Sequence, residues 1–280
     1  MKVFYSAECE KYWQEGHPEH PRRVRKTYEL LKDRFDFANA ESCNDNDLLL
    51  VHSEELINGV RHKEFFDPDT PNLPKMFEHA KLAVGGAIQA MQTALGNENA
   101  FSLLRPPGHH AGKKLLGGFC YFNSIAIAVK LALKSMDKIA IVDIDGHHGN
   151  GTQDIFVGDK NILFVSLHQK NAFPMSGLAS VQNCINYPLM PGIKSDQYLD
   201  TLDKAIDNVM DFDPDIIAVS AGFDTYKHDP LLELELEKEA YFEIAKTLKL
   251  PEKPVFAVLE GGYSTDLPIL IYEFLRGLRD

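Results

Sequence analysis

The sequence contains no apolar run long enough to span a membrane, and no early stretch resembles a signal peptide. It contains only four cysteines, at positions 9, 43, 120 and 184, and none of them forms a CxxC pair. Four scattered cysteines in a chain of this length do not indicate a disulfide scaffold. We therefore interpret them as reduced thiols and expect a cytoplasmic protein.

Positive charge is also scarce. The chain contains 29 Lys and Arg residues and 41 Asp and Glu residues, so its net charge is −12. Direct binding to nucleic acid needs a basic surface and is not expected. An acidic surface is compatible with a cationic substrate, although simple solvation is the commoner reason for it. We find no repeat, low-complexity run or composition shift, so one domain spanning 1–280 is expected.

Short apolar runs alternate with amphipathic segments along the chain. Strands are predicted at 2–5, 100–104, 139–142, 161–167, 215–221 and 255–259. Helices are predicted at 22–34, 47–51, 53–63, 76–95, 124–135, 196–210, 234–248 and 266–278. Such alternation is typical of an α/β fold with a mostly parallel sheet and helices on both faces.

The segment 138–151 combines a buried strand with two carboxylates, two imidazoles and three glycines. Alternate side chains of an extended segment point the same way, so Asp143, Asp145 and His147 can converge on one point. Carboxylates and imidazoles together suit a divalent first-row metal. The alternative is a polar strand-to-helix turn with capping residues.

Unusual polar residues follow five of the predicted strands. They are His109–His110, Asp143 to His148, His168, Asp224 and Tyr263. Parallel strands place their carboxyl ends on one edge of the sheet, where open α/β folds bind ligands. The sequence therefore predicts that these residues gather in one site.

The chain resembles the histone deacetylase superfamily over nearly its whole length. The motifs that carry the resemblance are His17-Pro-Glu, Leu50-Val-His-Ser, Arg105 to Ala111, Gly118 to Asn123, Asp143 to Gly151, Ser220 to Asp224 and Glu260 to Tyr263. The resemblance implies the arginase/deacetylase fold with an eight-stranded sheet. Asn150 and Glu260 resemble the class II branch, which includes bacterial, archaeal and acetylpolyamine-hydrolysing members.

The resemblance also implies two cation sites. Asp145, His147 and Asp224 would hold a catalytic Zn²⁺, with Fe²⁺ possible. Three protein ligands leave one position open, as catalytic zinc requires. A structural K⁺ would be bound mainly by backbone oxygens of Asp143, Asp145, His147, Ser166 and Leu167.

The catalytic residues implied by the resemblance are His109, His110, Tyr263, Asp143 and Asn150. Amide hydrolysis needs a base for water and an acid for the leaving amine, which two histidines can supply. Asp143 would accept a hydrogen bond from His109, while neutral Asn150 behind His110 favours His110 as the general base. Tyr263 would donate to the oxyanion.

The implied reaction is removal of an acetyl or other acyl group from an amine, such as acetyl-lysine or an acetylpolyamine. The implied substrate-binding residues are Phe119, Phe173, Gly118, Gly262 and Asp69. The segment 169–177 is shorter than usual in the family, and long insertions are absent, so the rim should be open. The acyl group, the carrier amine and the oligomeric state are left open by the sequence.

Two other functions share parts of this pattern. An arginase-like ureohydrolase with two manganese ions would need a second aspartate two residues after Asp224, and Tyr226 stands there. A non-catalytic acyl-lysine binding protein would have a degraded site, whereas every implied ligand and catalytic residue is present. Neither a nucleic acid nor a membrane is expected as a partner.

Overall fold

The computed structural model describes residues 1–280 and contains one sheet of eight parallel strands in the order β2-β1-β3-β8-β7-β4-β5-β6. The strands are β1 Lys2–Tyr5, β2 Asp36–Asn39, β3 Ala100–Ser102, β4 Ile139–Asp143, β5 Ile162–Gln169, β6 Cys184–Leu189, β7 Ile216–Ala221 and β8 Val255–Leu259. The expected α/β architecture and the strand number implied by the family resemblance are both confirmed.

The two strands that the sequence did not predict, β2 and β6, lie at the edges of the sheet. β2 reads Asp-Phe-Ala-Asn, and neither of its ends is buried. β6 contains Pro188, which lacks an N–H and is tolerated mainly on edge strands. Neither segment has the continuous apolar run that marks a strand buried on both faces.

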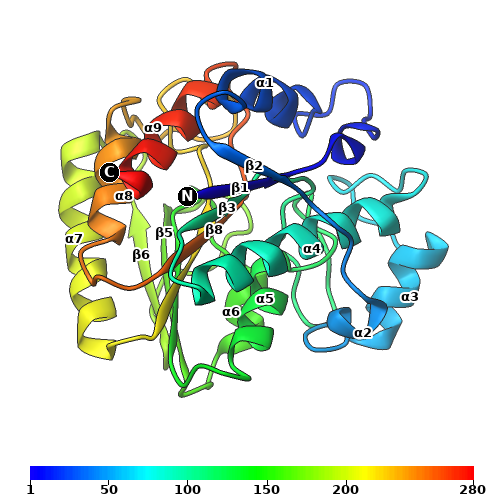
Figure 1. Cartoon of the computed structure of the whole chain (residues 1–280), viewed down its shortest axis with the longest axis horizontal. Helices are drawn as coiled ribbons and strands as arrows, with labels where there is room; N and C mark the ends of the chain where they lie inside the picture. Colours follow the sequence, from blue (N-terminus) through cyan, green and yellow to red (C-terminus); the bar gives the residue numbers. More distant parts are fainter.

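Helices cover both faces of the sheet (Figure 1). They are α1 Arg22–Leu31, α2 Asp45–Leu48, α3 Glu54–His62, α4 Met76–Leu95, α5 Ser124–Ala132, α6 Asn150–Phe156, α7 Ser195–Phe212, α8 Ala240–Leu248 and α9 Leu267–Arg279, with a 3₁₀ turn η1 at Ala7–Glu10. Helices α1, α9, α8 and α7 pack in series on one side, and α4 packs against α5 on the other. None of the helices is both long and apolar enough to cross a membrane.

The helix predicted at 234–248 begins only at Ala240. Before it, Leu232, Leu234 and Leu236 are buried while the intervening glutamates are exposed. This alternation has the period of an extended chain rather than of a helix. Leu236 accordingly forms a parallel bridge with Tyr226.

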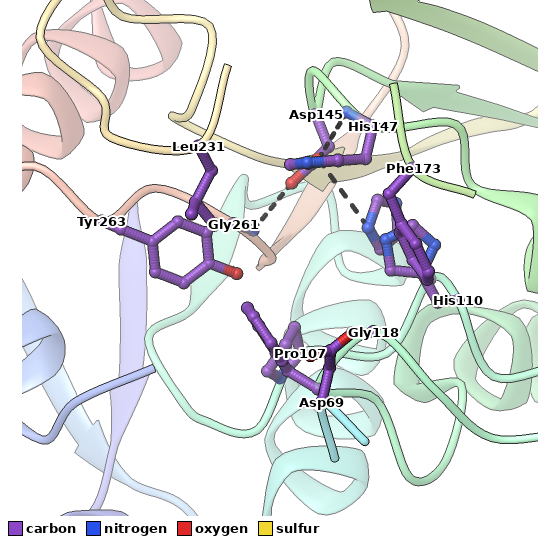
Figure 2. Close-up of a pocket in the computed structure, with 12 residues that line it drawn as sticks. Asp69, Pro107, His110, Gly118, Asp145, His147, Phe173, Leu231, Gly261 and Tyr263 are labelled. Carbon is purple, nitrogen blue, oxygen red and sulfur yellow. Dashed lines mark hydrogen bonds and ion pairs between the residues drawn. The ribbon is translucent and has the colours of Figure 1, made fainter. Parts of the chain in front are cut away.

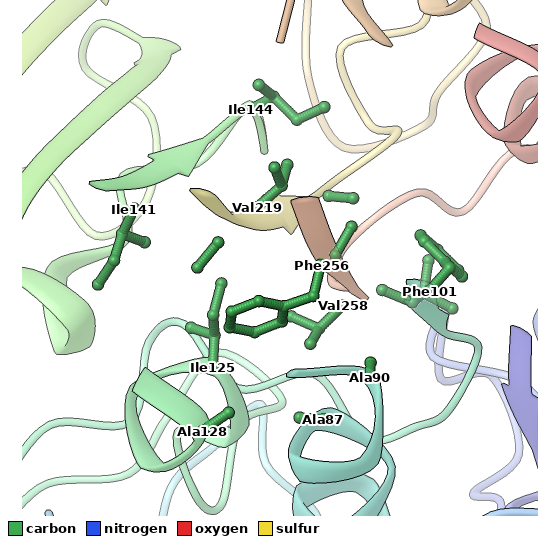
Figure 3. Close-up of a cluster of buried hydrophobic side chains, with 14 of the residues drawn as sticks. Ala87, Ala90, Phe101, Ile125, Ala128, Ile141, Ile144, Val219, Phe256 and Val258 are labelled. Carbon is green, nitrogen blue, oxygen red and sulfur yellow. The ribbon is translucent and has the colours of Figure 1, made fainter. Parts of the chain in front are cut away.

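The core between α4, α5 and the sheet combines alanines and Ile125 of the two helices with branched and aromatic strand residues (Figure 3). Ala87 and Ala128 face Ile141, Val219 and Phe256, and all are fully buried. The alanines let the helix backbones approach the sheet closely, so these apolar side chains are removed from water.

The five strands with polar carboxyl ends are consecutive in the sheet: β3, β8, β7, β4 and β5. The register aligns Asp143 of β4 with Ser166 of β5 and with Ser220 of β7. Their connecting loops therefore meet at one edge, as the sequence predicted.

Candidate active site

Asp145, His147 and Asp224 form the one potential metal-binding group, with ligand atoms that all lie within 4.8 Å of one another. His147 Nδ1 is 2.7 Å from Asp224 Oδ2 and 3.2 Å from Asp145 Oδ1. Both carboxylates are fully buried. Two buried carboxylate oxygens and one imidazole nitrogen are a donor set that fits a divalent first-row metal.

Backbone N–H groups hold the second oxygen of each carboxylate. Gly261 N donates to Asp145 Oδ2, and Gly146 N donates to Asp224 Oδ1, both at 2.7 Å. Glycine is required at this approach, because a Cβ on Gly261 would lie 2.5 Å from Asp224 Oδ2. Such supporting bonds orient metal ligands and so fix the geometry of the site.

The charge balance of the group also fits a cation. Burial disfavours the charged form of His147, but Asp224 and Asp145 outweigh it and raise the pKa of His147 to about 10. The two buried carboxylates thus attract a positive charge strongly, whether it is a proton on His147 or a metal ion. A metal ion bound at the three donor atoms would supply this positive charge and would need His147 to be neutral.

The tandem histidines lie beside this group, with different partners behind them. His109 Nδ1 is 3.0 Å from Asp143 Oδ2, and His110 Nδ1 is 2.7 Å from Asn150 Oδ1. The two rings are 4.0 Å apart between centroids. The structure therefore contains the hydrogen bond from His109 to Asp143 that the family resemblance implied, and Asn150 lies behind His110 as the resemblance also implied.

The surroundings of the two histidines shift their pKa values in opposite directions. Burial disfavours a charge on His109, yet Asp143, Asp145 and Glu260 raise its pKa well above the usual value. Burial and the neighbouring His109 lower the pKa of His110 well below the usual value. His110 is therefore neutral at neutral pH, whereas His109 carries a proton on both ring nitrogens.

These groups open into a cavity of about 270 Å³ (Figure 2). Its lining comprises Asp69, Pro107, His109, His110, Gly118, Phe119, Asp145, His147, Phe173, Leu231, Gly261 and Tyr263. Phe173 packs edge-on against His110, with ring centroids 5.0 Å apart, and Phe119 packs edge-on against Tyr263 at 5.7 Å. Aromatic walls of this kind suit an apolar methylene chain.

Tyr263 points its hydroxyl into the cavity, across from His110 (Figure 2). Its backbone N donates to Asp229 Oδ2 at 2.7 Å, and the Arg23 guanidinium carbon lies 4.7 Å from its ring centroid. Burial raises the pKa of Tyr263 well above its usual value, so the hydroxyl keeps its proton and can donate it in a hydrogen bond.

Other predicted residues lie behind or outside the lining. Asp224, Asp143 and Asn150 sit behind the lining residues that they contact. Gly262 does not line the cavity, and its carbonyl accepts a hydrogen bond from Arg23 Nε at 2.7 Å. Three lining residues were not assigned from the sequence: Pro107, Leu231 and Gly261. Pro107 and Gly261 lie within the motifs that carry the family resemblance, whereas Leu231 lies outside all of them.

His168 does not reach the cavity. Its Nδ1 is 2.9 Å from Ser166 Oγ, its Nε2 is 3.0 Å from the Gly177 carbonyl, and its ring packs on His148. Cys120 is buried, and burial raises the pKa of its thiol well above the usual range. The thiol is therefore protonated, in line with a structural rather than a nucleophilic role.

Comparison with known proteins identifies the family. Residues 17–271 match the family model described as the histone deacetylase domain. The chain belongs to the histone deacetylase family. It is 38% identical over 280 aligned residues to a probable deacetylase of Archaeoglobus fulgidus, with 89% of this chain and 77% of that protein covered. It is 34% identical to the acetylpolyamine amidohydrolase of Mycoplana ramosa, with 75% and 65% covered.

The solved HD domain of HDA15 has the same fold. It superposes with a TM-score of 0.92 at 29% sequence identity and covers all of this chain and 91% of that one. The fold and the matched family make the chain a hydrolytic deacetylase. Deacetylases of this family typically depend on a metal ion, and Asp145, His147 and Asp224 form the possible site for it.

Proposed function

We propose that the protein is a zinc-dependent amidohydrolase that removes an acetyl or other acyl group from a lysine side chain or a polyamine. The support is one cavity that brings together the metal-binding group, a neutral histidine and a tyrosine hydroxyl. These are the parts that amide hydrolysis needs: an electrophile activator, a general base and acid, and an oxyanion donor.

Asp145, His147 and Asp224 would hold the ion, with Zn²⁺ as the proposed metal and Fe²⁺ as an alternative. What the ion supplies when bound is Lewis acidity, which polarises a carbonyl oxygen and lowers the pKa of water. The same donor set leaves room for water and substrate on the cavity side, because only three protein ligands are present.

In the proposed reaction, His110 accepts a proton from the attacking water and returns a proton to the departing amine. Asn150 keeps His110 in the tautomer with its proton on Nδ1, so Nε2 can take the proton. His109 stays charged beside Asp143. Tyr263 donates its hydroxyl hydrogen bond to the oxyanion of the tetrahedral intermediate.

Phe119 and Phe173 would enclose the methylene chain of the substrate, with Gly118 between them and Asp69 at the rim. The acetylpolyamine amidohydrolase among the relatives supports a polyamine as one candidate substrate. The net charge of −12 favours cationic amines through long-range attraction. We also propose a structural K⁺ bound mainly by backbone oxygens of Asp143, Asp145, His147, Ser166 and Leu167.

The test is a panel of acetyl-lysine peptides, longer acyl-lysine peptides and acetylated polyamines. The purified protein is stripped with a chelator and reloaded with Zn²⁺ or Fe²⁺, and the released amine is measured. We expect hydrolysis of at least one acylated amine, only in the metal-loaded protein. Arginine serves as the control substrate, and release of urea from it with no deacylation would overturn the proposal in favour of a ureohydrolase.

A further inference from the structure

Glu19 belongs to the His17-Pro-Glu segment and takes no direct part in the chemistry proposed above. Its side chain is buried, and burial disfavours the carboxylate. Arg105 and Arg23 nevertheless lower the pKa of Glu19 to about 2, so it is ionised at neutral pH. The buried Glu19 carboxylate is therefore charged and is paired with both arginines. Each arginine also belongs to or contacts a different loop of the active site.

The first arginine leads to the tyrosine loop, residues 260–263. Arg23 Nη1 donates to Glu19 Oε1 at 3.0 Å. The same guanidinium donates through Nε to the Gly262 carbonyl at 2.7 Å and through Nη2 to the Glu260 carbonyl. It also lies over the ring of Tyr263. Arg23 thus contacts both the backbone and the ring that place the tyrosine hydroxyl.

The second arginine leads to the histidine loop, residues 105–110. Arg105 Nε donates to Glu19 Oε1 at 2.7 Å, and Nη2 donates to Glu19 Oε2. The remaining nitrogen, Nη1, donates to the carbonyls of Cys9 and Tyr12 at 2.8 and 3.0 Å. The bidentate contact leaves Arg105 little freedom, because it is fully buried and all of its nitrogens are engaged.

We propose that Glu19 is a positioning residue that fixes the tyrosine loop relative to the histidine loop, an inference that rests on the proposed function. Both arginines bond to the same carboxylate oxygen, Oε1, so a movement of either loop is transmitted through Glu19 to the other.

A second set of hydrogen bonds, made by the side chain of Glu260, connects the same two loops. Glu260 Oε2 accepts from the backbone N–H groups of Gly108 and His109 at 2.7 and 3.2 Å. This bond orients the start of the histidine pair, while the Glu19 contacts hold the arginines that brace both loops. Tyr263 and His110 must act on one substrate carbon, and a misplacement of about 1 Å can cost on the order of 10²-fold in rate. Two independent ties are a physical means to hold that spacing.

Hydrogen exchange of the metal-loaded protein tests the coupling without reference to activity. Glu19→Gln keeps the shape and loses the charge, so the amides of both loops should lose protection by about tenfold or more, the effect of losing a charge-assisted hydrogen bond. The matched control is Asp159→Asn, which removes the Asp159–Lys130 ion pair and contacts neither loop. It should leave protection in both loops unchanged.

A loss confined to one loop, or an equal loss over the whole chain, would overturn the proposal. If Glu19→Gln fails to fold, Arg23→Lys and Arg105→Lys replace it, because each keeps its charge but loses the guanidinium fork. Because the coupling passes through Glu19, each variant should lower protection in both loops, more in the tyrosine loop for Arg23→Lys and more in the histidine loop for Arg105→Lys. Unchanged protection in both variants would equally contradict the inference.

Kinetics on the best acylated amine supply the second readout. Glu19→Gln should lower kcat on the order of 10- to 100-fold with little change in KM. The same substitution in a Tyr263→Phe background should cost much less, because the group that Glu19 positions is already gone. If the fold-losses in kcat of the two single variants simply multiply in the double variant, the role of Glu19 is merely structural. If the wild type hydrolyses no acylated amine but the exchange result holds, the proposed function fails and the coupling of the loops stands.

Discussion

His110 donates through Nδ1 to the neutral amide of Asn150 at 2.7 Å, whereas its neighbour His109 pairs with the carboxylate of Asp143 at 3.0 Å. The two histidines thus share a location but not a charge environment. A carboxylate behind His110 would stabilise its imidazolium form, and the general base would then be lost at a higher pH than in the wild type.

Asn150→Asp should therefore shift the acidic limb of the pH profile of kcat/KM upward by about 1–3 pH units. The reason is that His110 must be neutral to accept a proton, and the new charge raises its pKa. Asn150→Ala is the control, because it removes the acceptor without adding charge and should lower the rate with no upward shift. An acidic limb that stays in place in Asn150→Asp would show that His110 is not the base.

Asp224→Ala should abolish stoichiometric metal binding and activity together. It removes one of three ligands and leaves His147 and Asp145 to share a two-coordinate site. Metal content after gel filtration and turnover are the measurements. Asp229→Asn is the matched control, since this buried aspartate bonds to the Tyr263 amide rather than to the metal group and should keep its metal. A metal-replete Asp224→Ala protein would contradict the ligand assignment.

His52, which lies outside the cavity lining, should make the stability of the fold depend on pH. Its Nε2 accepts a hydrogen bond from the backbone N–H of Asn123 at 2.9 Å, and its Nδ1 donates to the Gly112 carbonyl at 2.8 Å. The buried ring is therefore neutral. Burial lowers the pKa of His52 to about 4. The unfolded chain, with a pKa near 6.5, takes up a proton between pH 6.5 and 4 that the folded chain does not. Stability therefore falls as the pH falls through this window.

The expected loss from this one residue is at most about 3 kcal/mol. Urea unfolding of the metal-free protein from pH 7 to pH 4 measures it, in the wild type and in His52→Gln. The variant should start less stable and decline less steeply. Parallel curves for the two proteins would mean that His52 takes up its proton in the folded state as readily as in the unfolded state.

Gly118→Ala should block the cavity. The backbone φ of Gly118 is +55°, and an added Cβ would lie 2.5 Å from His110 Cδ2 and 2.7 Å from Phe173 Cε1. Displacement of both rings should lower kcat/KM on the order of 10²-fold. Gly192→Ala is the matched control, with φ +80° and nothing within 4 Å of the added atom. Equal losses in the two variants would trace the effect to backbone strain instead.

The central part of the fold could be read from the sequence because each central strand is a buried apolar run followed by polar residues. Edge strands β2 and β6 could not, since only one side of an edge is paired and their patterns are weak. The alternating Leu and Glu residues at 232–236 were assigned to a helix although their period is that of an extended chain.

The candidate site was predictable where residues carry chemistry and adjoin strand ends. The sequence could not reveal Leu231 in the lining, because it is an apolar residue outside every recognised motif. Nor could it reveal the contacts of Glu19, whose partner Arg105 is 86 positions away along the chain. Such contacts depend on how loops from different strands meet above the sheet.

The proposed mechanism depends most directly on Tyr263 as the oxyanion donor in this cavity. Tyr263→Phe keeps the ring, its contact with Phe119 and the metal-binding group, and removes only the hydroxyl. The decisive measurement is kcat, KM and metal content for the wild type and Tyr263→Phe on one acetyl-lysine peptide. We expect kcat to fall about 10²- to 10³-fold with KM and metal content nearly unchanged, because the lost bond belongs to the transition state. A kcat within about threefold of the wild type, far from the loss of an oxyanion donor, would mean that Tyr263 is structural and would contradict the proposed mechanism.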